Sequence, residues 1–352
     1  MTSNRSRGEE VRRFILEQAA RDPSRLARAT AQHFGISRQA VAKHIRSLME
    51  SGLLAASGRT RLRRHARQEI RDEILTFAVT DLDPEAVWRD HVRVWLAGRS
   101  EPVQEIWRFG LLEMLNNVLL HAQASHVWIA ATLGGSRVRL IVGDDGQGLF
   151  EKIQSRLGLT YRLQAVLELA KGPLTSPREG RPGAGIFLTS RLFDLFTIRS
   201  RELFYARNQD LDWDGVSEEE PVAGTFVWME LADDTPRTLA TVLARYRGGD
   251  AARRDLVTTV IPVELARFGA ELLTTREQAE RLMARVERFR TVVLNFKGVK
   301  SIGPGFAEHV FRTFPRLHPD VELLPVNCNE AVTASMRKIG FTVAPDRLPP
   351  PL

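Results

Sequence analysis

The sequence is poor in cysteine and has no long apolar run. Its single cysteine, Cys328, excludes an internal disulfide and is typical of proteins from reducing compartments. No stretch approaches the roughly 20 consecutive apolar residues of a membrane-spanning helix, and no Cys/His cluster indicates a zinc site. The first eight residues are polar and basic, without the apolar segment of a secretory signal. We therefore expect a cytoplasmic protein that does not bind membranes.

The charge is distributed unevenly along the chain. The 352 residues are enough for two or three domains, and 43% hydrophobic residues is ordinary for a globular protein. Residues 1–67 contain 15 Lys and Arg against 5 Asp and Glu, whereas the remaining residues contain 35 against 38. This asymmetry predicts a nucleic-acid-binding module joined to a near-neutral body. The alternative is a solvated basic arm.

Three helices separated by short breaks are predicted at the basic end. Apolar residues recur at helical spacing over Glu9–Ala20, Leu26–Phe34 and Arg38–Ser51. The turn before the third helix contains glycine, and the serine that follows can cap this helix with its hydroxyl group. A β-hairpin follows, with its tip at Ser57–Arg61. This order of elements argues against a structureless arm.

The outward face of the third predicted helix carries the candidate DNA contacts. Arg and Gln near a helix N-terminus suit base edges in the major groove, whereas Lys and Arg suit phosphates. Through the segments Ile36–Val41 and Leu48–Leu54, this region resembles the winged helix-turn-helix domains of bacterial transcription regulators. The resemblance implies binding to double-stranded DNA, and a winged helix that makes only protein contacts is the alternative. The candidate residues are Ser37, Arg38, Gln39, Lys43, His44 and Arg46, with Arg59 and Arg61 on the hairpin.

The central region begins with a predicted strand and linker, residues 68–84, followed by a helix that a proline opens. His91 lies on that helix, and a polar-face histidine is favoured over a phosphoacceptor because no dimerisation segment surrounds it. On the next helix, Glu113 and Asn117 stand four residues apart on one face. Such a pair could serve a metal–phosphate site, in which the amide oxygen ligates a hard cation and the carboxylate steers water. An ordinary exposed helix face is the alternative.

Later segments of the chain carry further motifs that suit a nucleotide site. The run Asp144-Asp145-Gly146-Gln147-Gly148 follows a predicted strand, and its glycines let the backbone approach a flat ring while an aspartate accepts a base's amino group. Residues 149–182 contain a helical part, 156–171, and a Pro/Gly-rich part, as lids often do. Gly183-Ala184-Gly185 then begins a helix over 186–196 whose first amides favour phosphate. A later strand opens with Gly224-Thr225.

The four motifs stand in a fixed order: Glu-x-x-x-Asn, Asp-x-Gly-x-Gly, a lid ending in Gly-x-Gly, and a late Gly-Thr strand. Over residues 85–232 they resemble the GHKL ATPase superfamily of gyrase, MutL, histidine kinases and anti-sigma-factor serine kinases. The resemblance implies an α+β sandwich of the Bergerat type that binds ATP and Mg²⁺. The resemblance implies that Asn117 ligates magnesium, that Glu113 activates the nucleophile and that His121 faces the phosphates. It further implies that Asp144 binds the adenine amino group, with Gly146 and Gly148 beside the base, and that Thr225 supports Asp144. Gly183 and Gly185 are the implied phosphate-binding glycines.

Two positions depart from the family pattern. Leu120 stands where many histidine kinases have a lysine, so one phosphate contact is missing from that position. Arg181 stands where the first glycine of the lid often falls, next to Gly180. The substitution changes the expected lid geometry and gives Arg181 a phosphate-sensing role.

The last third alternates predicted strands and helices, which indicates a small α/β layer. Its strands are predicted at 255–261, 291–296 and 321–326, with helices beginning at 275 and 330 and another ending at 314. The Gly-Val-x-Ser-Ile segment and the helix after it resemble the STAS domains of anti-anti-sigma factors. Gly303-Pro304-Gly305 stands where phosphorylatable members have a serine, and the nearest hydroxyl belongs to Ser301. A docking domain that never accepts phosphate is therefore favoured over a phosphoacceptor.

The sequence thus predicts a multidomain protein. Its expected parts are a winged helix domain (1–67), a linker (68–84), an ATP-binding domain (85–235), a second linker (236–252) and an α/β STAS-like domain (253–352). We expect a DNA-binding regulator in which ATP binding, with slow hydrolysis, changes the domain arrangement. A serine/threonine kinase acting on a STAS-like partner or in cis, and a non-catalytic ATP-sensing scaffold, are the alternatives. A homodimer and a protein partner of the STAS-like domain are expected by analogy.

Overall fold

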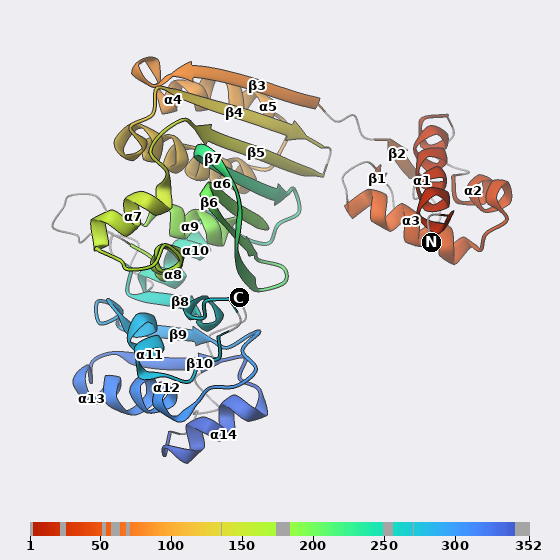
Figure 1. Ribbon diagram of the computed structural model, residues 1–352. Helices are drawn as coiled ribbons and strands as arrows, with labels where there is room; N and C mark the ends of the chain where they lie inside the picture. The colour runs from red at the N-terminus through yellow and green to blue at the C-terminus, as the bar shows by residue number, and fades with distance from the viewer. Residues whose placement is uncertain are drawn as a thin grey trace. The chain divides into compact units, whose positions relative to one another are not determined.

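The computed structural model describes residues 3–21, 26–50, 54–57, 64–67, 71–134, 136–173, 184–248, 256–269 and 271–341. The predicted site residues Arg59, Arg61, Arg181 and Gly183 lie outside these ranges. The chain divides into two compact units (Figure 1), one made of Met1–Leu75, Ala130–Leu140 and Glu230–Thr235, and the other of the remaining residues. No helix in the described ranges combines the length and the apolar character needed to cross a membrane.

The N-terminal residues form three helices and a two-stranded antiparallel hairpin. The helices are α1 (Ser3–Arg21), α2 (Leu26–Phe34) and α3 (Arg38–Glu50), and the strands are β1 (Leu54–Ser57) and β2 (Arg64–Arg67). The apolar positions of the three helices meet in one core, because each helix buries one stripe of side chains. Its buried members are Val11, Ile15, Ala19, Leu26, Val41, Ile45, Leu48 and Leu54.

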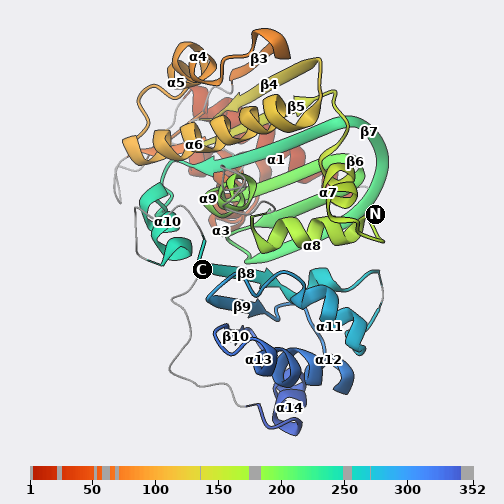
Figure 2. The same ribbon diagram turned by 90° about the vertical axis from the view of Figure 1, so that its left-hand side faces the viewer.

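A five-stranded sheet forms the middle of the fold. Its strands are β3 (Arg71–Ala78), β4 (His126–Leu133), β5 (Arg137–Asp144), β6 (Leu195–Asn208) and β7 (Trp213–Ala232), in the order β3-β4-β5-β7-β6. Alternate residues of β4 are buried, as expected for a strand with one covered face. Figure 2 shows α6 and α9 lying across one face of this sheet.

Seven α-helices belong to the central region in the described residues, and the π-helical turn Trp88–Val92 joins the first two. They are α4 (Pro84–Val87), α5 (Arg93–Trp95), α6 (Glu101–Asn117), α7 (Leu149–Leu157), α8 (Leu163–Lys171), α9 (Gly185–Leu192) and α10 (Leu239–Arg247). Helix α6 buries Ile106, Trp107, Leu111, Met114 and Leu115 at helical spacing, and the adjoining π-helical turn Val118–Ala122 ends it. This burial holds the face with Glu113 and Asn117 in a defined orientation.

Several boundaries differ from the sequence predictions. The predicted helix over 156–171 is broken, because Gly158 adopts a left-handed conformation (φ 61°) that ends α7. Helix α9 ends at Leu192 instead of continuing to Phe196, since Phe193 is extended and Phe196 is a buried residue of β6. Helix α10 lies in a segment predicted as a linker, and β7 begins before Gly224, whereas β3 lies where a strand was predicted ahead of Pro84.

The C-terminal residues form a small parallel α/β layer. Strands β8 (Thr258–Pro262), β9 (Thr291–Asn295) and β10 (Glu322–Val326) pair in the order β10-β9-β8. Val292, Val293 and Leu294 are all buried, because a central parallel strand is covered on both faces. The helices are α11 (Arg276–Met283), α12 (Pro304–Glu308), α13 (Phe314–Leu317) and α14 (Glu330–Lys338).

Candidate functional site

An open pocket of about 510 Å³ lies where α6, the end of β5, the start of α7 and the middle of β7 meet. Five of the predicted site residues line it, although more than 100 positions separate the first from the last. They are Asn117, His121, Asp144, Gly148 and Thr225. The other lining residues are mostly apolar, as is usual for small-molecule pockets: Met114, Val118, Ala122, Val142, Leu149, Lys152, Ile186 and Val227.

Asp144 is the buried acid of the pocket, at the end of β5. Its Oδ1 atom accepts a hydrogen bond from the backbone N–H of Gly146 at 2.8 Å. Burial raises the pKa of this carboxyl, and the backbone N–H groups of Gly146 and Thr225 oppose the rise by stabilising the anion. A carboxylate held in this way can accept further hydrogen bonds from an amino group inside the pocket.

Thr225 joins three segments of the site through its hydroxyl group. Its Oγ1 atom accepts from the N–H of Leu149 at 3.0 Å and lies 3.0 Å from Ser200 Oγ, which also accepts from Leu149 at 2.7 Å. The start of α7 is therefore fixed to β6 and β7. Ser200 was not among the predicted residues, since a lone serine within a β-rich run carries no sequence signal.

Gly146 is required by a close approach of two backbones. A Cβ atom on Gly146 would overlap the carbonyl oxygen of Ala122, which also accepts from the N–H of Gln147 at 2.9 Å. Any larger residue would push apart the loop after β5 and the end of the π-helical turn. The second motif glycine, Gly148, lines the pocket with a φ of 95° and precedes α7.

Asn117 carries a buried polar atom at the pocket that is unpaired among the described residues. Its Nδ2 atom is buried without a hydrogen-bond partner in the part of the chain that the structure describes. Rotating the amide by half a turn would place Oδ1 at the position of Nδ2. An oxygen atom is the ligand that Mg²⁺ prefers. The described residues contain no group of three or more His, Cys, Asp or Glu able to hold a metal. A cation beside Asn117 would therefore need ligand phosphates and water to complete its coordination.

His121 and Lys152 lie at the polar side of the pocket. The Nζ atom of Lys152 donates to the carbonyl oxygen of His121 at 2.7 Å, and burial, with Arg156 nearby, lowers the pKa of Lys152. Of the described residues that line the pocket, Lys152 is the only lysine or arginine. It supplies a cation that sequence reasoning missed, whereas Leu120 is exposed outside the pocket.

Glu113 and Gly185 meet beside the pocket. A Cβ atom on Gly185 would overlap Oε2 of Glu113, so a larger residue at the first position of α9 would require the Glu113 side chain to move. The next residue of α9, Ile186, lines the pocket. Glu113 itself is not among the lining residues. The carboxylate thus lies against the helix N-terminus where the sequence predicts phosphate binding.

The predicted DNA contacts that the structure describes lie on α3 or directly before it, whereas Arg59 and Arg61 lie outside the described residues. Arg38, Gln39, Lys43 and Arg46 of α3 are exposed, and so is Ser37, whose Oγ atom accepts from the N–H of Ala40 at 3.1 Å and caps the helix. His44 is half-buried. Burial, followed by the charges of Arg12 and Lys43, lowers its pKa, so that His44 is neutral at pH 7.

The C-terminal layer combines three parallel strands with flanking helices. Residues 278–333 match a family described as the STAS-like domain of unknown function (DUF4325). This match confirms the STAS-like prediction for the C-terminal part of the chain. No curated protein matches the chain. The match covers β9, β10 and the start of α14, and it says nothing about the residues before 278.

The STAS-like domain contacts the central region through a buried ion-pair cluster on α8. Lys171 Nζ lies 2.7 Å from Glu168 Oε1 and donates to the carbonyl oxygens of Arg281 and Ala284 at 2.8 and 3.0 Å. Glu168 Oε2 also lies 2.6 Å from Arg285 Nη2. Burial lowers the pKa of Lys171 to about 8, although Glu168 opposes the decrease. Sequence analysis missed this cluster, because its members come from distant segments.

The hydroxyl considered as a phosphoacceptor is accessible. Ser301 is exposed before α12, and it lines a separate small hollow of the STAS-like domain with Arg267, Lys300 and Glu264. The helix after it begins with Gly303 as its cap and Pro304 in the first turn. The structure therefore keeps Ser301 apart from the start of the helix, as the sequence indicates.

Proposed function

We propose that this chain is a DNA-binding regulator whose central region binds ATP with Mg²⁺ and hydrolyses it slowly. The observation that carries the proposal is the convergence of Asn117, His121, Asp144, Gly148 and Thr225 on one pocket. These residues come from three separate segments, and each segment matches a motif of the GHKL resemblance. A chance set of polar residues would have no reason to converge in that order.

In the proposed complex, Asp144 accepts a hydrogen bond from the adenine amino group. The apolar lining residues Met114, Val118 and Val142 cover the faces of the base. Lys152 stands at the polar side, where its ammonium group can contact a phosphate oxygen. It would replace the contact that Leu120 cannot make.

For hydrolysis, we assign to Glu113 the role of orienting the attacking water molecule. Its carboxylate lies beside Gly185, the first residue of α9, and the N-terminus of a helix favours phosphate through its backbone N–H groups and dipole. A water molecule between Glu113 and the terminal phosphate would be polarised by the carboxylate. Asn117 would hold Mg²⁺, which when bound neutralises charge on the phosphates.

The DNA-binding part of the proposal rests on the exposed basic face of α3. Arg38, Lys43 and Arg46 are exposed, and the helix is preceded by a turn and a serine cap. Residues 1–67 carry the net charge of +10, which supports attraction to phosphate backbones. The three helices and hairpin of this unit fit the winged helix arrangement.

Replacing Asp144 with asparagine should weaken ATP binding about 10- to 100-fold, since a hydrogen bond to a charged group contributes about 1.5–3 kcal/mol. Asparagine keeps the shape and an oxygen acceptor for the Gly146 N–H. Isothermal titration of ATP–Mg²⁺ into both proteins measures the change. The matched control is Asp81→Asn, an exposed acid outside the pocket, which should bind like the wild type. Equal affinities for Asp144→Asn and wild type would contradict the proposal.

Nucleotide should also change the affinity for DNA. We expect ATP–Mg²⁺ to shift the dissociation constant for a labelled random-sequence duplex at least about fivefold, the lower end of typical allosteric coupling. Fluorescence anisotropy at fixed low salt measures it, with phosphate release followed in parallel. Asp144→Asn should remove the shift and keep DNA binding. A chain that binds no DNA, or binds it equally with and without ATP, would disprove the regulatory part.

A further inference from the structure

The three parallel strands of the STAS-like domain end together at one edge. Asn295 is the last residue of β9 and is in register with Pro262 of β8 and Val326 of β10. Asn327 follows β10 directly. The carboxyl ends of parallel strands are where open α/β sheets bind their ligands. In this protein the edge presents two side-chain amides next to each other.

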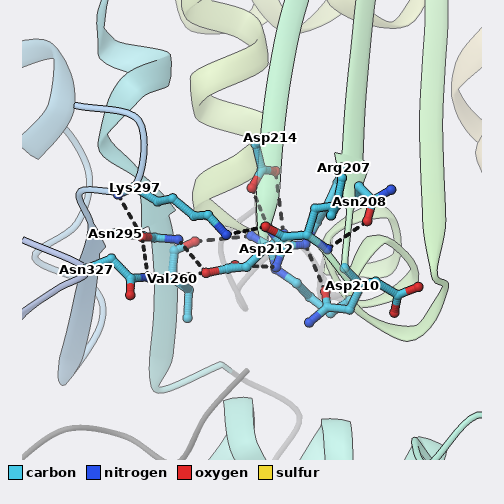
Figure 3. A network of polar contacts seen from close by, with 12 residues as sticks. Arg207, Asn208, Asp210, Asp212, Asp214, Val260, Asn295, Lys297 and Asn327 are labelled. Atoms are coloured by element: carbon cyan, nitrogen blue, oxygen red, sulfur yellow. Dashed lines mark hydrogen bonds and ion pairs between the residues drawn. The ribbon is translucent and has the colours of Figure 1, made fainter. Parts of the chain in front are cut away.

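The turn between β6 and β7 occupies this edge (Figure 3). Asp212 Oδ2 accepts from Asn295 Nδ2 at 3.1 Å and from Asn327 Nδ2 at 3.3 Å. Asn327 Nδ2 also lies 2.9 Å from Asn295 Oδ1, and Lys297 Nζ donates to the carbonyl oxygen of Leu211. Each STAS-like side chain therefore directs a donor towards the turn, and the turn presents acceptors.

The surface presents donors to an acceptor side chain, and the cationic groups nearby favour a carboxylate. Two amide N–H groups converge on one carboxylate oxygen, and an ammonium group lies on the neighbouring carbonyl. The second carboxylate oxygen, Asp212 Oδ1, lies 3.7 Å from Nη2 of Arg207. A neutral side chain of the same shape would remove one negative charge from beside Lys297 and Arg207.

The turn is preformed by contacts of the central region. Asn208 Oδ1 accepts from the N–H of Leu211 at 2.9 Å, and the N–H of Asp212 donates to the carbonyl oxygen of Gln209 at 3.2 Å. Behind it, Arg207 is buried and paired with Asp214, whose Oδ1 accepts from the hydroxyl of Tyr205 at 2.6 Å. Because these groups fix the hairpin, binding costs little ordering entropy.

We propose that the edge formed by Asn295, Lys297 and Asn327 is a binding surface for an aspartate presented on a tight turn. The Asp212 turn is its resident ligand and holds the STAS-like domain on the central region. An acidic turn of another protein would have to displace Asp212 to bind. The side chains of Asp212 and Lys297 belong to the partly exposed rim of the contact, which makes such an exchange feasible. This inference is independent of ATP binding.

A charge-exchange pair of variants tests the resident contact. Asn327→Asp places a second carboxylate against Asp212, and combining it with Asp212→Asn restores an amide–carboxylate pair in the opposite direction. Both positions have left-handed φ values, 43° for Asp212 and 55° for Asn327, which Asn and Asp tolerate about equally. The single variants should therefore fold.

Hydrogen–deuterium exchange of the full-length proteins gives the readout in the segments 208–213 and 291–297. We expect roughly tenfold faster exchange in Asn327→Asp, as for the loss of a charge-assisted hydrogen bond, and wild-type rates in the double variant. Wild-type rates in Asn327→Asp, or no recovery in the double variant, would overturn the proposal.

A peptide probe tests whether the surface accepts an acidic turn from outside. A fluorescein-labelled cyclic peptide with the sequence of residues 208–214 is titrated with the full-length wild type and with Asp212→Ala, in which the Asn295 and Asn327 amides have lost their resident carboxylate. We expect at least about tenfold tighter binding to Asp212→Ala, because the wild-type site is already filled. A control peptide with asparagine in place of Asp212 should lose this preference. Equal binding of the probe to both proteins, or binding to neither, counts against the surface.

Discussion

Replacing Glu113 with glutamine should lower the rate of phosphate release from ATP about 10²- to 10⁴-fold, the usual contribution of a positioned base. Glutamine has the same shape, so it fits against Gly185 as the carboxylate does. It cannot orient and polarise an attacking water molecule in the same way. Because Glu113 is not among the residues that line the pocket, ATP affinity should change little. Steady-state phosphate release and ATP titration on the same preparations measure the two quantities.

Glu105 provides the matched control for this experiment. It lies on the same helix, α6, but is exposed, so Glu105→Gln should release phosphate at the wild-type rate. A Glu113→Gln protein that keeps the wild-type rate would remove Glu113 from the mechanism.

The same proteins separate the proposed ATPase from its alternatives. With γ-labelled ATP, free phosphate is expected, whereas label that accumulates on the protein would support a kinase with an acceptor such as Ser301. A non-catalytic sensor would show nucleotide-dependent DNA binding that Glu113→Ala leaves intact, without turnover. Each outcome follows from whether Glu113 activates water, a hydroxyl or nothing.

Replacing Lys171 with methionine should destabilise the protein by about 3–5 kcal/mol, the typical cost of removing one partner from a buried ion pair. The ammonium group donates to Glu168 and to the carbonyl oxygens of Arg281 and Ala284. Methionine fills a similar volume but leaves both carbonyl groups unpaired in the interior. Urea unfolding followed by tryptophan fluorescence measures the loss, since all six tryptophans lie between residues 88 and 228.

The stability difference between the two proteins should depend on pH. In the folded state the pKa of Lys171 is lowered to about 8, whereas the unfolded chain has the ordinary value near 10.5. Between these values the unfolded state binds more protons, so the wild type gains stability relative to Lys171→Met as the pH rises. The gain is up to about 3 kcal/mol at pH 10.5.

An exposed ion pair on the STAS-like domain is the control. Arg276 and Glu280 on α11 lie 2.8 Å apart but are largely exposed, so Arg276→Gln should cost less than about 0.5 kcal/mol at any of these pH values. A flat pH dependence for Lys171→Met relative to wild type would show that the buried amine is not the titrating group.

The pocket could be anticipated from sequence because its parts are local motifs. Asp144 and its glycines follow β5 directly, and their spacing alone predicts a carboxylate beside a closely approaching backbone. Glu113 and Asn117 share a face because the helix repeat places residues four apart together. That these segments line one pocket was inferred from the order of the motifs, and the structure brings five of their residues together.

Other features of the site had no local signal. Lys152 and Ser200 look like ordinary helix and strand residues in the sequence, and only tertiary contacts place them at the pocket and behind Thr225. The break at Gly158 and the early end of α9 were missed because apolar periodicity continues across them. In both cases the backbone conformation of one residue ends the helix.

The sequence by itself determined the basic end, the local motifs and the STAS-like character of the last third. Each of these depends on composition or on residues close together in the chain. Only the tertiary structure decided which distant groups pair: Lys171 with Glu168 and the turn after α11, and Asp212 with Asn295 and Asn327. The reason is physical. A buried charge or amide needs a hydrogen-bonding partner. The sequence around it does not say which of many distant groups the packing will bring within hydrogen-bonding distance.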